Sequence, residues 1–330
     1  MSTTIRVAIV GASGETGQSI VNALLSSSTP KFEITALTRP QSLHKPTNLA
    51  LQARGVNIVP ADLRGPAAPL IDLLQGIDVV ISAIHFDALA DEIPLADAAK
   101  AAGVQRFVQS ALMIVIPPRG VVDFREKKEE NLHHIQKLRL PYTYIDAGWW
   151  HQLTLPRLPS GRVDHLLPRP PAAHPSLPLG LDGNVPTALA DLRDVGRYVA
   201  RIIADPRTVN KRVHVYNEVY TLNRVYEVVE RVSGERLGRR FVSEAQARAA
   251  VDDARTQLSL TPGDPTALLA HVAAQLFYSW AIRGDNTPEY ARYLGYVSGK
   301  DLYPDFEYVS FEEYVTEAIR GEGKGVYQDR

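Results

Sequence analysis

The chain has 330 residues, of which 45% are hydrophobic, and its 36 basic and 37 acidic residues give a net charge of −1. This balance argues against a nucleic-acid partner, because a nucleic-acid-binding surface requires a clustered basic excess. The absence of cysteine excludes disulfides, thiolate nucleophiles and zinc–cysteine sites. No apolar run approaches the ~20 residues that span a bilayer, and MSTTIR leads directly into an expected strand, so we expect a soluble cytoplasmic protein with no membrane partner.

The most informative segment is IRVAIVGASGETG at residues 5–17. Its first six residues predict a buried parallel strand, because β-branched residues fill it without clean alternation. Three glycines and an amphipathic helical segment follow. In such a unit the first glycine permits a tight turn, the second admits a pyrophosphate, and the third allows close helix packing. We therefore predict that a dinucleotide's phosphates bind at this helix N-terminus, against Gly11, Ala12, Ser13, Gly14, Glu15, Thr16 and Gly17. The alternative is an ordinary strand–helix turn.

Strands and helices alternate through the first half of the chain. Further strands are predicted at 33–39, 55–63, 77–84, 105–112 and 141–148, and helices at 66–75, 90–102 and 124–138. This alternation predicts right-handed crossovers and a parallel sheet. The expected fold is therefore α/β, a Rossmann doubly wound parallel sheet, with its ligand site at the carboxyl ends of the strands.

The pattern changes after Trp150. Eight prolines lie within 156–186, and we expect no regular element there. Helices are predicted at 191–206, 223–234, 243–258 and 264–283, and a strand at 211–217 returns to the sheet. We therefore predict a Rossmann domain at 1–155, completed by 190–218. A smaller C-terminal substrate-binding domain is expected from 156–189 and 219–330.

Basic residues follow the second predicted strand, where a dinucleotide's adenosine ribose is expected. Arg39 ends this strand and Lys45 comes six residues later. An acidic residue here would bind the 2′-hydroxyl of NAD, whereas a guanidinium pairs well with a phosphate, so NADP is the expected cofactor. The alternative is a solvent-exposed arginine. Ala83, Ile84 and Ser110 end two further strands and are expected beside the same cofactor.

The segment 124–138 carries a lysine on its apolar face. A helical wheel places Lys128 within the inner stripe and Lys127 at its edge; the stripe is formed by Phe124, Leu132, Ile135 and Leu138. A buried lysine is costly without a function or a partner, and desolvation lowers its pKa toward the range that suits proton transfer. The alternative is an ordinary lysine whose aliphatic stem lies along the core while its ammonium reaches solvent. Tyr142 and Tyr144 have Asp146 and Gly148, not a lysine, four residues later, so the usual Tyr-x-x-x-Lys mechanism of short-chain dehydrogenases is not expected at this strand.

Aromatic residues follow the strand at 141–148. Trp149 and Trp150 either form a wall for an aromatic substrate or seal the junction of the two lobes. His85 follows the strand at 77–84 and is a further candidate for substrate contact, with a solvated loop histidine as the alternative. His133 and His134 point in different directions on a helix, so we expect no metal site.

Together these motifs resemble a known family. The chain resembles the isoflavone reductase-like, NmrA-like branch of the atypical short-chain dehydrogenases, in its fungal form. The resemblance rests on GASGETG, Arg39, VVISAI, RFVQS, the lysine helix, PYTYIDAGWW and DLRDVGRYVARIIADPRTVNKRVHVYN, and it covers most of residues 5–234. Beyond residue 240 it is loose.

The resemblance implies NADPH as the cofactor and a helix lysine as general acid or base beside the nicotinamide. Counting back from PYTY identifies this lysine as Lys128, whereas counting forward from Phe124 gives Lys127; the helical wheel favours Lys128. Residues 109–113 read QSALM where plant members have P-S-E-F-G, so plant phenylpropanoid substrates are not expected.

The function that the resemblance implies is an NADPH-dependent reductase of a small aromatic or polyketide-like secondary metabolite. Hydride would reach a C=O, a C=N or a conjugated C=C bond. One alternative is an NADP-sensing regulator that binds a protein partner. Another is a redox-neutral isomerase, dehydratase or cyclase. A monomer or a homodimer is expected.

Overall fold

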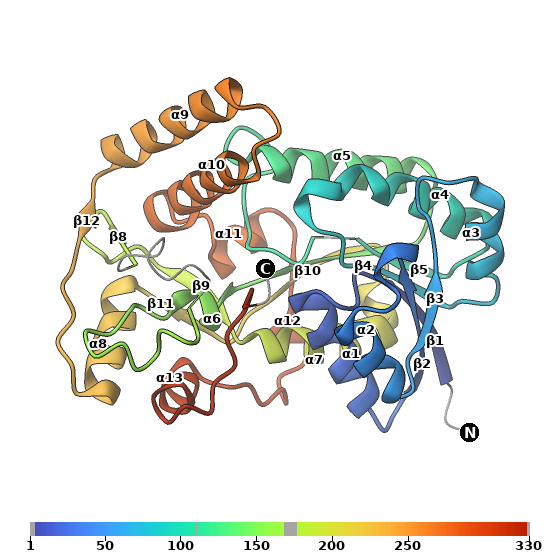
Figure 1. The fold of residues 1–330 in the computed structure, drawn as a ribbon, viewed down its shortest axis with the longest axis horizontal. Helices are drawn as coiled ribbons and strands as arrows, with labels where there is room; N and C mark the ends of the chain where they lie inside the picture. Colours follow the sequence, from blue (N-terminus) through green and yellow to red (C-terminus); the bar gives the residue numbers. More distant parts are fainter. Residues whose placement is uncertain (1–3, 110, 168–176, 329–330) are drawn as a thin grey trace.

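The computed structural model describes residues 4–109, 111–167 and 177–328. Its centre is a parallel eight-stranded sheet in the order β13-β10-β6-β5-β4-β1-β2-β3 (Figure 1). The strands are β1 (Thr4–Val10), β2 (Lys31–Thr38), β3 (Asn57–Pro60), β4 (Val79–Ser82), β5 (Arg106–Val108), β6 (Tyr142–Ala147), β10 (Lys211–Val215) and β13 (Val297–Ser298). The order reverses between β1 and β4, which is the switch point of a doubly wound sheet. The predicted Rossmann fold is confirmed.

Helices cover both faces of this sheet because each strand presents apolar side chains to both. On one face lie α1 (Glu15–Ser26), α2 (Pro46–Ala53) and α7 (Leu192–Ala204), with Val7 and Ile9 of β1 beneath them. On the other lie α3 (Ala67–Leu74), α4 (Glu92–Ala101) and α5 (Asp123–Lys137), over Ala8 and Val80. Figure 1 shows α3, α4 and α5 above the sheet and α1 and α7 below it.

The remaining elements build a second lobe beside the carboxyl ends of the strands. Its helices are α6 (His151–Thr154), α8 (Leu222–Ser233), α9 (Glu244–Leu260), α10 (Pro265–Phe277) and α13 (Phe311–Ile319), whereas α11 (Pro288–Tyr293) and α12 (Gly299–Leu302) contact β13 of the main sheet. Two small sheets join β7 (Trp149–Trp150), β9 (Thr187–Ala190) and β11 (Glu218–Tyr220), and β8 (Leu179–Gly180) with β12 (Phe241–Val242). Its core contains Tyr226, Trp280 and Phe311. No described helix is both long and apolar enough to cross a membrane.

Several predicted elements differ in extent. The strand predicted at 105–112 is only Arg106–Val108, because the chain then leaves the sheet as a loop beside β6. The strand predicted at 55–63 is Asn57–Pro60. The expectation of no regular element within 156–186 is wrong at β8, where Gly180 fits against the Ala281 carbonyl so closely that a Cβ would lie 2.0 Å from its oxygen.

The second half supplies two strands to the main sheet. The predicted return of 211–217 is confirmed, since β10 pairs in parallel with β6. The sequence did not predict β13, whose two residues pair with β10. The predicted helix at 264–283 is α10 followed by a π-helical turn at Tyr278–Arg283. The division into domains at residue 155 stays a prediction.

Candidate active site

The glycine turn is held between the end of β4 and the start of α1. Gly11 has φ +83°, and a Cβ there would lie 2.3 Å from the Ala83 carbonyl oxygen. A Cβ on Gly17 would lie 2.0 Å from the Gly11 carbonyl oxygen. Gly14 is the N-cap of α1 and has no side chain to occupy the first amide groups of the helix. These amides therefore remain suited to an anion at the carboxyl end of β1.

The other residues predicted at the cofactor surround this turn. The Ala83 amide N–H donates a hydrogen bond to the Val10 carbonyl at 2.9 Å, so the ends of β1 and β4 lie side by side. Ile84 is the next residue after Ala83. Val10 also pairs with Leu37 of β2, so Arg39 lies two residues beyond the same edge of the sheet. Arg39 and Lys45 are both exposed, and Lys45 is the N-cap of α2. Ala12 is buried and Ser13 and Thr16 are half-buried. Ser110 lies outside the described residues.

Lys128 of α5 points toward the loop that follows β5. Its side chain is only 4% exposed, and its Nζ donates to the Ala111 carbonyl oxygen at 3.0 Å. Burial lowers the pKa of Lys128 to about 8; nearby Arg125 also lowers it, whereas Glu92 and Asp146 act to raise it. Lys127 is exposed. Of the two lysines, the structure thus places Lys128 at the strand ends, as the helical wheel predicts.

A network of buried charges holds α5 against the sheet and flanks Lys128. Arg125 is fully buried, and its guanidinium contacts Glu129 at 3.0 Å, Asp146 of β6 at 2.7 Å and the Tyr296 hydroxyl at 2.6 Å. The Tyr296 hydroxyl in turn donates to Asp146 at 2.6 Å. Arg212 of β10 pairs with Glu129 from the other side. We call Arg125, Glu129, Asp146, Tyr296 and Arg212 the buried-charge network.

The sequence analysis missed this network. The helical wheel placed Phe124 and Leu138 on the inner stripe, but both are only half-buried, whereas Arg125 and Glu129 are buried. A usable signal was the Arg–Glu pair at i and i+4 on either side of Lys128, together with an aspartate inside the apolar strand PYTYIDAG. Charges that share a buried helix face need partners on the facing strand.

The two tryptophans lie on opposite faces of β7 and do not form one wall. Trp149 stacks on Trp280, with ring centroids 5.3 Å apart, inside the second lobe's core. Trp150 stacks instead on Tyr327, at 6.2 Å. Residues next to each other in a strand point in opposite directions, which explains the separation. Trp149 therefore packs against the core of the second lobe, and Trp150 stays the candidate for substrate contact.

Aromatic rings lead from the end of β4 to Lys128. The His85 ring contacts Phe86, with centroids 4.2 Å apart and the ring planes tilted by 39°, and Phe86 contacts Phe124 at 5.6 Å. The Lys128 Nζ lies 6.0 Å from the Phe124 ring centroid. His85 also pairs with Asp87 at 2.7 Å. The lysine is therefore bordered by an apolar, aromatic surface, of which the sequence predicted only His85.

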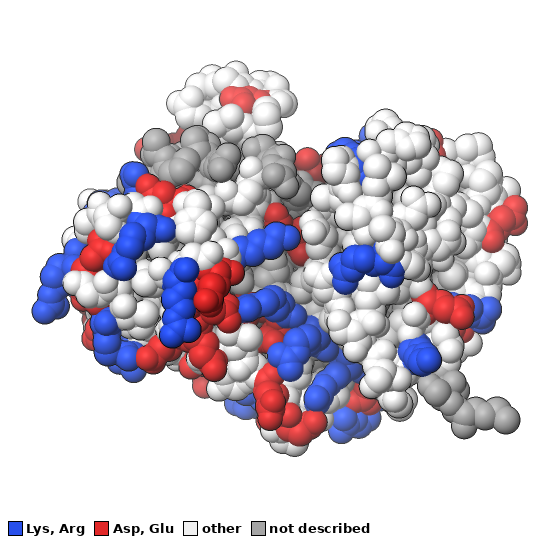
Figure 2. Space-filling model, turned by 60° about the horizontal axis from the view of Figure 1, so that its bottom comes forward, with Lys and Arg blue, Asp and Glu red and all other residues white. Residues whose placement is uncertain are grey.

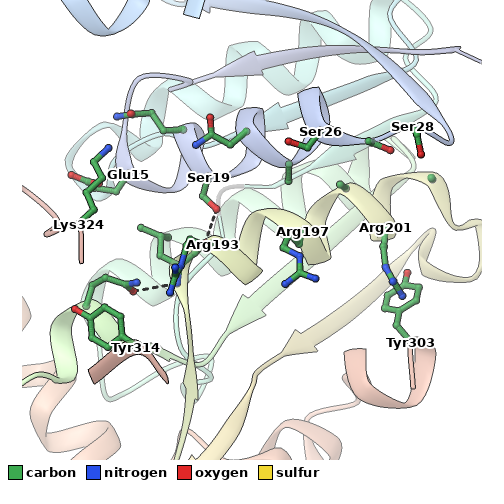
Figure 3. Close-up of a pocket in the computed structure, with 18 of the residues that line it drawn as sticks. Glu15, Ser19, Ser26, Ser28, Arg193, Arg197, Arg201, Tyr303, Tyr314 and Lys324 are labelled. Carbon is green, nitrogen blue, oxygen red and sulfur yellow. Dashed lines mark hydrogen bonds between the residues drawn. The ribbon is translucent and has the colours of Figure 1, made fainter. Parts of the chain in front are cut away.

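A groove of about 1070 Å³ lies elsewhere, between α1, α7 and the residues after α13 (Figure 3). Arg193, Arg197 and Arg201 line it, but neither Lys128 nor Gly11 does. Each arginine is paired with a carboxylate, at 2.6–3.0 Å. Basic and acidic side chains are accordingly interspersed on the face that Figure 2 shows. The groove is not the candidate active site. Among the described residues no cluster of three or more His, Asp or Glu can hold a metal.

The fold and this arrangement define a class of protein. The model of the NmrA-like family matches residues 3–315, and the chain belongs to this family. In fold it is similar to leucoanthocyanidin reductase from Vitis vinifera, solved as a binary complex with NADPH. The TM-score is 0.78 at 23% identity, over 96% of this chain and 99% of that one. A structure of isoflavone reductase gives a TM-score of 0.76 at 24% identity, with the same coverage.

Two named relatives cover nearly the whole chain. Asnovolin J 5′,6′-dehydrogenase of Aspergillus novofumigatus (strain IBT 16806) is 55% identical over 318 residues, which is 96% of each chain. Probable pinoresinol-lariciresinol reductase 3 of Arabidopsis thaliana is 29% identical over 318 residues, 94% of this chain and 96% of the relative. The resemblance to a fungal member of the isoflavone reductase-like group is confirmed.

The buried-charge network predicts a strong stability effect. Arg125→Met leaves Asp146 and Glu129 buried without this guanidinium, and such a loss costs about 3–5 kcal/mol of unfolding free energy. Arg125→Met/Asp146→Asn should cost less than the sum of the two single changes, because it also removes the stranded charge. Urea unfolding measures all three.

The control for these variants is Arg224→Met on α8. Its exposed ion pair with Glu227, at 3.3 Å, should contribute less than about 1 kcal/mol to the free energy of unfolding. A cost below about 1 kcal/mol for Arg125→Met would show that the network does not hold α5.

Proposed function

We propose that this chain is an NADP(H)-dependent oxidoreductase that acts on a small aromatic or polyketide-like secondary metabolite, with Lys128 as its proton donor in reduction. The observation that carries the proposal is the buried Lys128 ammonium at the strand ends, where burial brings its pKa to about 8. A family member that only sensed NADP would gain nothing from a desolvated lysine, which costs stability.

The residues at the strand ends fit a dinucleotide. Gly11 and Gly17 leave no room for a Cβ, so the turn brings backbone amides close to any anion seated there. Arg39 and Lys45, both exposed beyond β2, fit the additional 2′-phosphate that distinguishes NADP from NAD. The relative in fold from Vitis vinifera was solved with NADPH, which supports the same assignment.

Lys128 supplies the proton that accompanies hydride transfer. Bound NADPH provides the hydride. The Ala111 carbonyl accepts a hydrogen bond from the Lys128 ammonium and so holds this group at the ends of the strands, where a substrate would meet the cofactor. A group with a pKa near neutrality can give or take the proton, so the same lysine serves reduction and dehydrogenation. The name of the Aspergillus relative, a dehydrogenase, supports use of the oxidative direction as well.

The substrate is expected against the aromatic surface beside Lys128. His85, Phe86 and Phe124 present rings there, and Trp150 lies beyond the end of β6. Rings of this kind select apolar or aromatic acceptors by area and shape. The loop 109–113 differs from the plant pattern, so the acceptor need not be a phenylpropanoid.

Replacing the proton donor tests the proposal directly. Lys128→Met should reduce turnover about 10²- to 10⁴-fold, the usual contribution of a general acid, while NADPH affinity stays within about twofold. The first probe is asnovolin J with NADP+, followed by other fungal aromatic metabolites with either cofactor form. Lys127→Met, on the exposed side of the helix, is the matched control and should retain full activity. Undiminished turnover in Lys128→Met would remove the lysine from the mechanism.

The pH dependence follows from the lowered pKa of Lys128. Reduction requires the ammonium form, which is lost as pH rises through about 8, so the reductive rate should fall tenfold per pH unit above it. Dehydrogenation requires the neutral amine, so its rate should rise up to about pH 8 and then level off. Rates of reduction and of dehydrogenation, each measured against pH, test these two expectations. In Lys128→Met neither rate should change in this way near pH 8.

Cofactor choice is tested at Arg39. Arg39→Ala should weaken NADPH binding roughly 10- to 100-fold, because a charge-assisted contact to the 2′-phosphate is lost, and should leave NADH binding unchanged. Arg54→Ala is the control, since Arg54 is exposed at the end of α2 and its guanidinium donates to the Asn22 side chain. Equal weakening for both cofactors would contradict a phosphate contact at Arg39.

A further inference from the structure

The residues after α13 connect the second lobe to the glycine-turn helix. A glycine, Gly321 with φ +76°, follows the end of α13, and residues 322–328 then run to the middle of the molecule between the two lobes (Figure 1). We call residues 322–328 the C-terminal strap. It also forms one edge of the groove beside α1 and α7, with Lys324 and Glu15 both lining that groove (Figure 3).

Close packing fixes the strap on the second lobe. A Cβ on Gly325 would lie 2.7 Å from the Leu166 carbonyl oxygen, so this position requires glycine. Val326 is 2% exposed, and the Gln328 amide donates to the Leu167 carbonyl at 2.8 Å. The strap therefore has a defined position up to its last described residue.

On the other side, Tyr327 contacts two residues of the candidate active site. Its backbone amide donates to the Glu15 carboxylate at 2.7 Å, across 312 positions of sequence. Its ring stacks on Trp150 at 6.2 Å, with 27° between the ring planes. Tyr327 adopts φ +57°, a left-handed conformation that a tyrosine rarely takes, and this backbone presents the amide to Glu15 while the ring lies on Trp150.

Glu15 presents an electrostatic problem at this position. It is the first residue of α1, directly after the N-cap Gly14, where the proposed cofactor's diphosphate would bind. A carboxylate there is favourable to the helix dipole but repels a diphosphate. In the structure Glu15 lines the α1–α7 groove, which Gly11 and Ser13 do not line, so its charge is directed away from the turn.

We propose that the C-terminal strap sets cofactor affinity by holding the Glu15 carboxylate away from the diphosphate position, with the Tyr327 amide as the positioning group and Trp150 as its anchor. This rests on the proposed NADP(H) function. Tyr327 acts through Glu15 and takes no part in hydride or proton transfer. When the strap is absent, Glu15 is free to turn toward the phosphates.

The test is a cycle of two changes read by NADPH titration, which needs no substrate. Truncation after Val326 should weaken NADPH binding about tenfold. Glu15→Gln in the full chain gives the reference dissociation constant for the second background. When the truncation is made in the Glu15→Gln variant, it should cost less than about twofold, because no charge remains to repel the diphosphate. A merely structural role for the strap would give the same loss in both backgrounds.

Two further measurements separate charge from packing. The tenfold loss on truncation should shrink as salt is raised, since it is a repulsion between partly exposed charges. Tyr327→Gly keeps the amide and accepts the left-handed backbone but removes the ring, and should weaken binding only about threefold. Thermal unfolding of each variant monitors the fold.

The possible outcomes are distinct. A truncated chain that binds NADPH as tightly as the full chain, or a loss that Glu15→Gln does not rescue, overturns the role of the strap and leaves the proposed function intact. A folded full-length chain that does not bind NADPH overturns both.

Discussion

The Arg125 guanidinium fixes the rotation of α5, and the geometry of the candidate site depends on that rotation. Arg125 and Lys128 are one helical turn apart and share the inner face, so the orientation that places Arg125 on Asp146 also directs Lys128 to the Ala111 carbonyl. A fully buried guanidinium tolerates little displacement, because any shift would leave a charge unpaired in the interior. The ion pair therefore defines where the ammonium lies relative to the strand ends.

The same network ties a late segment of the chain to the helix that carries Lys128 and contributes to the pKa of the lysine. Tyr296 lies between α11 and β13 and bonds both Arg125 and Asp146, so the segment that leads into β13 is coupled to α5. Electrostatically, burial and the Arg125 cation lower the pKa of Lys128, while the Glu92 and Asp146 carboxylates oppose them. The balance leaves the pKa of Lys128 at about 8, close enough to neutrality for the group to give or take a proton.

The fold, the tight glycine turn and the burial of Lys128 were largely predictable, because local patterns encode them. Glycine spacing, strand–helix alternation and the wheel position of Lys128 each reflect constraints within a few residues of sequence. The buried-charge network escaped prediction because Arg125 and Glu129 look like surface residues until their partners on β6 and β10 are known. The contact of Tyr327 with Glu15 was equally inaccessible, since 312 residues separate its two ends. Trp149 and Trp150 stack on different partners, because successive residues of β7 point in opposite directions, and their roles stay predictions.

The two ends of the site are constrained in different ways, and this bears on how substrates can vary within the fold. At the turn, Gly11 and Gly17 are fixed by backbone contacts that exclude any side chain. Lys128 is anchored by the backbone carbonyl of Ala111, a contact that does not depend on the side chain at that position. Substitutions at 111–113, or among the rings of Phe86 and Phe124, can therefore reshape the aromatic surface without moving Lys128, the proposed proton donor.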